Sequence, residues 1–404
     1  MALNTRFPTE ITILILSFLP VKDLASASRV SRYLQALSEP LLYREPSLPP
    51  AVAEPSSLYI FVRTLLTPGR ESLVSHVRTL LVDWDESSST LPSEPESEIA
   101  LFTAAESRLG IQNLRASYGA QIVLCLYLLP FLTTLDVMPS FRNHDFEVFI
   151  ESLHATLPTS LPPGLQSLRV FNWYSDGCEQ GVSYAMLLTI MRLPCIRTID
   201  VDIIEELRGP FPDPDSRAIS GITNLHFSAA ISSTSLTRIL TLPRALTHFS
   251  FNLTLGYDLN LSHLSTALKP LQRSLQILEL GIFDRWSRGE VDGLLTSLRE
   301  WPVLRSVRIA PVTLLGVENE QGLAQVLPAG LCALGIFSDY ISLDTDIAEI
   351  VLVMLGQKGK MLPCLRRLAL PPCIEANPKL FTEIIVACEK VGVVVVRHSE
   401  LFVG

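Results

Sequence analysis

Two ten-residue stretches that share one pattern decide the fold: Arg192–Val201, RLPCIRTIDV, and Met361–Leu370, MLPCLRRLAL. In each, a proline follows an apolar residue, and apolar positions then recur as Φ-x-x-Φ-x-Φ, where Φ is apolar. Proline stops a preceding helix, because it lacks the N–H that the helix needs. The alternation that follows puts two apolar side chains on one face of a short strand. The pattern therefore predicts a helix that ends at the proline and a strand directly after it.

The pattern recurs along most of the chain. It is found again, with the proline, at 128–137, 161–170, 241–251, 300–309 and 326–337, and without it at 77–82, 222–227, 275–280 and 391–396. The first residues of the Φ-x-x-Φ-x-Φ pattern fall at 132, 165, 196, 222, 246, 275, 304, 331, 365 and 391, spacings of 24 to 34 after a longer first gap from 77. A period in that range is typical of a leucine-rich repeat, in which each unit buries its apolar side by stacking on its neighbours.

Helical spacing of apolar residues separates the predicted strands, as in Met186–Arg192, Leu264–Leu268 and Ile347–Leu355. Residues 58–404 thus resemble a helix-containing leucine-rich repeat of about eleven degenerate copies. The resemblance implies an α/β fold, a strand–helix solenoid with a mainly parallel, curved sheet. The family usually has Asn or Cys eight residues after the first leucine, and here only Cys373 and Thr254 keep a side chain that suits that hydrogen-bonding ladder.

The first 45 residues predict three short helices. After Pro8, apolar residues between Ile11 and Leu19 recur at spacings of three and four, which indicates a helix, and Ile13 and Leu16 make further sides of that helix apolar. A 45-residue unit has few partners with which to cover such a helix. The cluster is therefore expected to bind another protein through its exposed apolar surface.

Prolines and helix-capping residues set the predicted boundaries of the helices and of the linker. Pro20 ends the first helix, Asp23 is expected to cap the second, and Ser31 the third. Residues 46–57, PSLPPAVAEPSS, carry too much Pro and Ser for a helix or strand and read as a linker. The expected domains are a helix cluster at 1–45, the linker, and the repeats at 58–404.

The order F-P-x-E-I-x-x-x-I-L-S-F-L-P-x-x-D-L from Phe7 to Leu24, followed by Val30-Ser31-Arg32 and Pro40-Leu41-Leu42-Tyr43, is similar to the F-box motif along its full length. Three positions depart from the family's usual residue but keep a large apolar side chain: Phe7, Leu34 and Tyr43. The resemblance implies docking onto a Skp-type adaptor that is held by a cullin scaffold. Matching positions assign seven residues to the adaptor interface or its immediate support: Pro8, Ile11, Ile15, Leu16, Leu19, Leu24 and Val30. Packing the three helices together is the alternative role for these residues.

The function that this resemblance implies is non-enzymatic: a substrate receptor of a ubiquitin ligase complex, with repeats that bind a protein target for degradation and with no cofactor. The alternative is a leucine-rich-repeat scaffold for protein–protein interaction with no link to a ligase. The chain has no G-x-S-x-G, G-x-x-x-x-G-K-[ST] or H-E-x-x-H motif. The sequence therefore carries no signature of an acyl-transfer or a phosphate-binding enzyme.

The amino-acid composition argues against some classes of partner and favours one kind of cellular compartment. No run of about 20 apolar residues occurs, since Pro130 interrupts the longest stretch, Ile122–Leu135, so no membrane segment is predicted. The net charge of −9 and the lack of a Lys/Arg cluster argue against nucleic acid. Seven cysteines stand singly, without a C-x-x-C pair, which suits a reducing compartment, cytoplasmic and/or nuclear. The acidic, Ser- and Pro-rich stretch Asp83–Glu98 predicts an exposed loop.

Side chains between the buried strand positions should form an open row, one group per repeat. Those predicted to contact the target are Arg169, Phe171, Asp200, Asp202, His226 and His248. Because neighbouring strands lie about 4.8 Å apart, two aspartates and two histidines of this row are expected to meet. Such a group suits metal binding or acid–base chemistry, while polar residues on an open sheet face are also what solvation alone requires.

Overall fold

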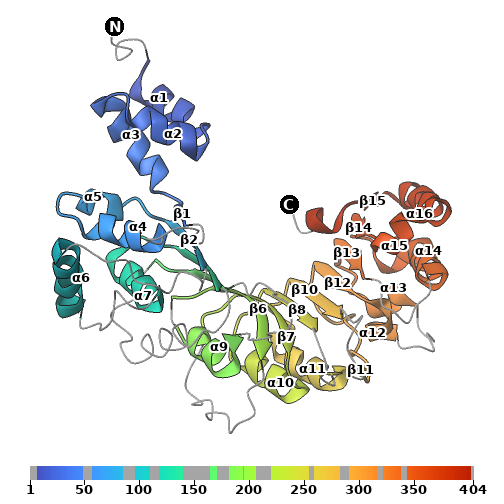
Figure 1. Ribbon diagram of the computed structural model, residues 1–404. Coiled ribbons are helices and arrows are strands. Elements are labelled where there is room, and N and C mark those ends of the chain that lie inside the picture. Colours follow the sequence, from blue (N-terminus) through green and yellow to red (C-terminus); the bar gives the residue numbers. More distant parts are fainter. Residues whose placement is uncertain are drawn as a thin grey trace. The chain divides into compact units, whose positions relative to one another are not determined.

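The computed structural model describes residues 7–48, 57–84, 96–109, 118–139, 164–170, 182–193, 195–205, 220–253, 259–282, 291–315, 322–337 and 344–401. The chain forms two compact units, Met1–Gln180 and Gly181–Gly404. Figure 1 shows helices and parallel strands in each of them.

The first unit begins with three helices and continues with strands and helices. Its described helices are α1 (Thr9–Ser17), α2 (Val21–Ser28), α3 (Arg32–Leu42), α4 (Ser57–Leu66), α5 (Glu71–Val74), α6 (Glu96–Leu109) and α7 (Tyr118–Leu128). Its sheet is parallel, in the order β1 (Ser47–Leu48), β2 (Thr79–Trp84), β3 (Thr134–Pro139) and β4 (Ser167–Val170). Strand β1 lies in the stretch predicted as a linker, whose residues 49–56 are outside the described part. The same holds for residues 85–95 of the predicted acidic loop, while Glu96–Glu98 belong to α6.

Of the two predicted helix N-caps, Ser31 is confirmed and Asp23 is wrong. Ser31 Oγ accepts a hydrogen bond from the N–H of Leu34 at 3.2 Å, so it caps α3 as predicted. The prediction that Asp23 caps α2 is wrong, because Pro20 occupies the N-cap and no side-chain cap bond forms. Asp23 lies instead in the first turn, where a carboxylate interacts favourably with the positive end of the helix dipole.

The second unit repeats the strand–helix alternation. Its described strands are β5 (Val182–Ser183), β6 (Thr198–Glu205), β7 (Asn224–Ala230), β8 (His248–Leu253), β9 (Leu259–Asn260), β10 (Ile277–Ile282), β11 (Val291–Asp292), β12 (Ser306–Ile309), β13 (Ala333–Ile336), β14 (Arg367–Ala369) and β15 (Val394–Val395). Its described helices are α9 (Tyr184–Met191), α10 (Ser233–Thr241), α11 (Leu261–Leu268), η3 (Lys269–Leu271), α12 (Pro311–Leu315), α13 (Leu323–Val326), α14 (Asp344–Met361), α15 (Pro372–Glu375), α16 (Pro378–Val391) and η4 (His398–Glu400).

The parallel sheet predicted from the repeats is confirmed. In the second unit the order is β6-β7-β8-β10-β12-β13-β14-β15, with β5 beside β6, and β9 pairs separately with β11. Each of the eleven copies yields a strand that begins two residues after its first apolar residue, as at 196 and 198, or three residues in the last copy. The prolines act as expected: α9 ends at Met191 before Pro194, and α14 ends at Met361 before Pro363.

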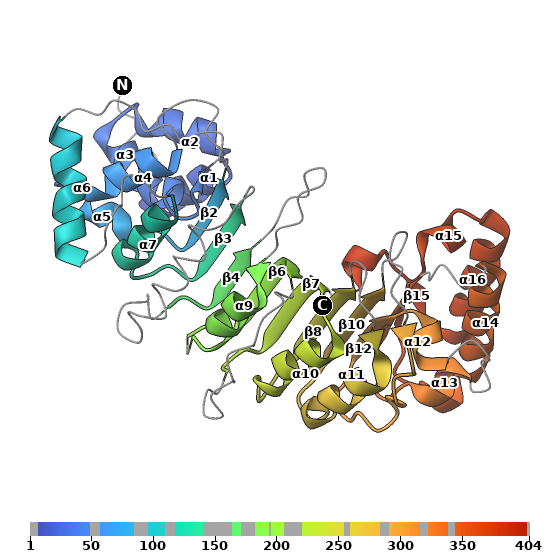
Figure 2. The ribbon, with the colours of Figure 1, turned by 60° about the horizontal axis from the view of Figure 1, so that its bottom comes forward.

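The apolar positions of the pattern form the core. Ile196, Ile199 and Val201 of one repeat are completely buried, and the corresponding residues of its neighbours pack beside them. Figures 1 and 2 show α9, α10 and α11 on one side of β6, β7 and β8, so the polar strand positions face the opposite, open side. None of the described helices combines the length and the apolar character that crossing a bilayer requires.

Candidate functional site

The three N-terminal helices expose a large apolar surface. Helix α1 buries a single residue, Leu16, although most of its nine residues are apolar. We call the exposed set the apolar helix surface; it comprises Phe7, Ile11, Ile13, Leu14, Ile15, Phe18, Val21 and Val30. Phe18 is 80% exposed and Val30 69%. So many exposed apolar side chains on one small cluster are typical of a protein-binding site.

The residues predicted to bind the adaptor divide into two groups. Pro8, Ile11, Ile15 and Val30 are exposed, and Leu19 is half-buried. Leu16 and Leu24, each 4% exposed, lie in the core of the cluster, where they can support an interface but not touch a partner. Sequence reasoning missed Phe18, Val21 and Leu14 as surface residues, because their apolar character alone did not show which side of each helix the cluster leaves uncovered.

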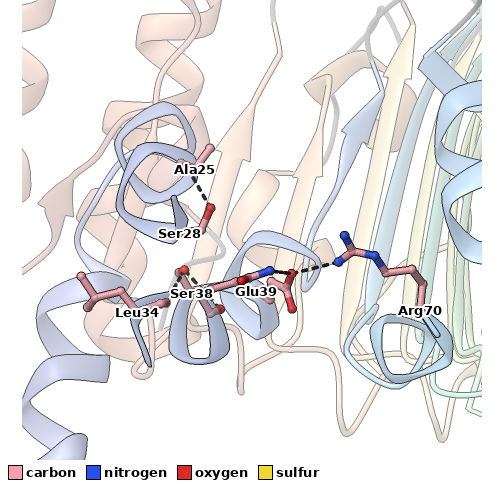
Figure 3. A network of polar contacts seen from close by, with 7 residues as sticks. Ala25, Ser28, Leu34, Ser38, Glu39 and Arg70 are labelled. Atoms are coloured by element: carbon pink, nitrogen blue, oxygen red, sulfur yellow. Dashed lines mark hydrogen bonds and ion pairs between the residues drawn. The ribbon is translucent and has the colours of Figure 1, made fainter. Parts of the chain in front are cut away.

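Polar contacts join this cluster to the first repeat, as Figure 3 shows. Glu39 of α3 accepts hydrogen bonds from Gln35 Nε2 at 2.9 Å and from Arg70 NH1 at 3.1 Å, and Arg70 is the N-cap residue of α5. Ser28 and Ser38 donate to carbonyl oxygens of their own helices, at 2.7 and 2.6 Å. The bond between Arg70 and Glu39 is the one of these that links α3 to the segment before β2.

The backbone strengthens the same junction. The N–H groups of Arg78 and Thr79 both donate to the carbonyl of Arg44, at 2.9 and 3.2 Å, directly before β2 begins. Strand β1 then pairs with β2, with Ser47 opposite Leu81. The helix cluster and the start of the sheet are therefore connected by backbone bonds to Arg44 and by the pairing of β1 with β2.

On the open face of the second unit, the strand register aligns the polar positions. Asp200 lies opposite His226, and Asp200 Oδ1 is 3.8 Å from His226 Nε2. His248 Nε2 is 3.0 Å from Oε1 of Glu279 on β10. The side chain of Asp202 and the whole of Phe171 lie outside the described residues, and Arg169 is exposed on β4 of the first unit. Among the described residues, no three His, Cys, Asp or Glu side chains are grouped to hold a metal.

Glu279, on β10, is the centre of a charged cluster whose pairing the sequence did not show. Besides His248, it contacts Arg308, whose NH1 is 3.4 Å from Oε2 of Glu279. Partial burial lowers the pKa of Arg308 from its ordinary value, and the carboxylate of Glu279 opposes that shift. Only 12% of the Glu279 side chain is exposed, so the acid is held by its two partners rather than by water.

Replacing Glu279 is expected to destabilise the protein measurably. Glu279→Ala leaves a half-buried guanidinium and an imidazole without their acceptor, which costs about 1–3 kcal/mol of unfolding free energy. Urea denaturation measures the loss. Glu375→Ala, the same change at an exposed position, should stay within about 0.5 kcal/mol of wild type. Equal effects of the two substitutions would contradict a structural role for the cluster.

Residues 396–401, called segment 396–401 below, return across the open face of β12–β14. Leu401, 1% exposed, packs on Ala333 and Ala369 with Val396 beside it. The ring of His398 stacks on Phe337 at a centroid distance of 5.8 Å. Burying one leucine contributes about 1.5–3 kcal/mol, and ordering each backbone residue costs about 1–2 kcal/mol.

Acidification is expected to loosen segment 396–401. Burial is the main cause that lowers the pKa of His398 from its ordinary 6.5, with the charge of Arg308 second; a backbone hydrogen bond with Leu370 and the charge of Glu279 act in the opposite direction. Because the docked pKa lies below the undocked value, the undocked segment binds the proton more readily. The stabilisation is complete above pH 6.5 and is lost as the pH falls through the docked pKa.

Hydrogen exchange checks this expectation. The amide protection factor of Leu401, corrected for the intrinsic pH dependence of exchange, should fall when the pH is lowered from about 7.5 to about 5.5. The amide of Leu334 on β13 serves as the internal reference. A protection factor of Leu401 that stays constant over this range would show that His398 does not control the segment.

Two buried cysteines have deactivated thiols. Burial raises the pKa of Cys125 and raises that of Cys388 to about 11. A raised thiol pKa keeps the sulfur protonated and poorly nucleophilic at neutral pH.

Comparison with known proteins gives one family match, to the N-terminal helices. The F-box-like family model matches residues 5–49, which contain α1, α2 and α3. No curated protein matches the sequence. Among solved structures, the crystal structure of the yeast Rad7–Elc1 complex contains a similar chain, with a TM-score of 0.37, 10% sequence identity, and coverage of 90% of this chain and 88% of that chain.

Proposed function

We propose that the protein is a substrate receptor of a cullin-based ubiquitin ligase: the F-box-like helices bind a Skp-type adaptor, and the repeats bind a target protein. One observation carries the proposal. The F-box-like match at residues 5–49 coincides with the part of the chain that exposes the apolar helix surface. A match in sequence and a surface that suits a protein partner thus point to the same helices.

The repeats support the second half of the proposal. Their period of 24 to 34 residues and one parallel strand per period are typical of leucine-rich repeats. Such repeats create an extended open face on which a protein can dock. We propose that the target binds this face, through predicted residues that include Asp200 and His226. The role needs no catalytic group of its own, because the ligase supplies the transfer chemistry.

Two contacts connect the helix cluster of the proposed receptor with the start of its sheet: Arg70 donates to Glu39, and the N–H of Arg78 donates to the carbonyl of Arg44. We also propose a cytoplasmic and/or nuclear location, which the dispersed cysteines favour.

Affinity capture from cells tests the proposal. The full chain should recover a Skp-type adaptor and a cullin together, and blocking ubiquitin transfer should enrich one or more further proteins, the targets. A chain with Ile15→Asp should recover the targets but not the adaptor or the cullin. Capture of other proteins without adaptor and cullin would instead identify an interaction scaffold that has no link to a ligase.

A further inference from the structure

We propose that the open face of β12–β14 is a binding site for a short peptide of the target, and that segment 396–401 occupies this site until the target takes its place. The peptide it fits presents a planar ring and, three residues later, an aliphatic side chain, as His398 and Leu401 do. This inference rests on the proposed function, since the target is the partner that would carry the peptide.

A socket for the aliphatic side chain is built from small residues. Gly335 on β13 and Ala369 on β14 are in register with Glu279 on β10 and Arg308 on β12, and Ala333 lies two residues before Gly335 on the same face. A Cβ atom at Gly335 would lie 2.7 Å from Cδ2 of Leu401 and 2.9 Å from Cγ of Arg308, so a larger residue here would displace one of these side chains. The missing side chain makes the depression that Leu401 fills.

A platform for a planar ring lies next to the socket. The guanidinium of Arg308 is centred 4.2 Å from the ring centroid of Phe337, and the His398 ring stacks on Phe337 with an interplanar angle of 9°. Glu279 holds the guanidinium from the other side. An aromatic or imidazole ring that lands here meets a preformed stacking surface.

The backbone of the bound segment is also recognised. Arg367 NH1 lies 3.3 Å from the carbonyl oxygen of Leu401 and 3.5 Å from that of Glu400. Arg367 contacts backbone carbonyl groups alone, so these contacts do not depend on the side chains of the bound segment. The side chains of Arg397, Ser399 and Glu400 are exposed. The site therefore selects through the ring and the aliphatic residue alone.

Most residues of segment 396–401 are not buried, although the N–H of Val396 donates to the carbonyl of Leu368 on β14 at 2.9 Å. None of the three residues of η4 is buried, and Leu401 is the one described residue of the segment that is. A tethered segment acts at an effective concentration on the order of millimolar. A target peptide competes with it when its own docking is tighter, and the tether then moves aside without unfolding the sheet.

A fluorescent peptide with the sequence of Val396–Leu401, VRHSEL, tests the site on the full chain by anisotropy. Leu401→Asp releases the tether and leaves the socket intact, so the peptide should bind about tenfold more tightly than to wild type. Adding Gly335→Ala fills the socket and should remove that binding. Ser399→Ala, an exposed position, should bind the peptide as wild type does.

Two results would overturn the proposal. One is a Leu401→Asp chain that unfolds as wild type does in urea yet binds no peptide, because segment 396–401 would then be a permanent part of the fold. The other, which needs no variant, is slow exchange of the Leu401 amide in the unmodified chain, equal to that of Leu334 on β13. Adaptor binding is measured on the same samples: its loss with peptide binding intact would reject the proposed function and not this site.

Discussion

Ile15→Asp is expected to weaken binding of a purified Skp-type adaptor at least about thirtyfold, while the free energy of unfolding stays within about 0.5 kcal/mol of wild type. Ile15 is half exposed on α1 and belongs to the apolar helix surface with Ile11 and Phe18. A carboxylate at this position would have to lose its water when the partner covers it, which is costly for a charged group. Isothermal titration calorimetry measures the affinity, and urea denaturation measures the stability.

Two further substitutions on α1 make the result specific. Ser17→Asp introduces the same charge at an exposed polar position of the same helix and should change the affinity far less. Leu16→Asp should also remove adaptor binding, but for a different reason: Leu16 is buried, so the charge unfolds the helix cluster. An Ile15→Asp chain that binds the adaptor as wild type does would show that the apolar helix surface is not the interface.

Phe249→Ala is expected to cost about 3–5 kcal/mol of unfolding free energy in the second unit. Phe249 packs beside the rings of Phe227 and Phe251, at centroid distances of 5.9 and 6.4 Å, and all three side chains are buried. Removing the ring leaves a cavity on the helix-covered side of the sheet, where neighbours on three strands cannot all close in. Urea denaturation of the full chain, followed by tryptophan fluorescence and circular dichroism, measures the loss.

A second phenylalanine provides the matched control. Phe131 is 51% exposed and lies under the guanidinium of Arg78 at 4.9 Å, so Phe131→Ala should cost only about 1 kcal/mol. A loss at Phe249 as small as that at Phe131 would mean that the aromatic core does not hold the repeats together.

The repeated strand was the most predictable feature of this chain. Each predicted strand appears, because the same short pattern fixes both where the helix stops and which side chains enter the core, as at Pro194, Ile199 and Val201. The capping role of Ser31 was predictable for the same reason, since a cap depends on residues that are close in sequence. Asp23 shows the limit of local rules: its side chain suits a cap, but Pro20 sets an earlier start.

The candidate sites were predictable only in part, because they depend on contacts across the sequence. The open row was foreseen, yet the pairing of His248 with Glu279 follows from a diagonal between strands 31 residues apart. The burial of Leu16 beside the exposure of Phe18 depends on how three helices cover one another. Segment 396–401 crosses the face of strands whose small residues, such as Gly335, are ordinary in the sequence and become a socket only when assembled.

The most direct test of the account is the affinity of the unmodified full chain for a purified Skp-type adaptor, measured by isothermal titration calorimetry. If residues 5–49 act as an F-box, the two proteins should form a one-to-one complex with a Kd below about 1 µM. No detectable complex at about 10 µM, with a chain that shows its full cooperative unfolding transition, would contradict the proposal that this protein is a ubiquitin ligase receptor.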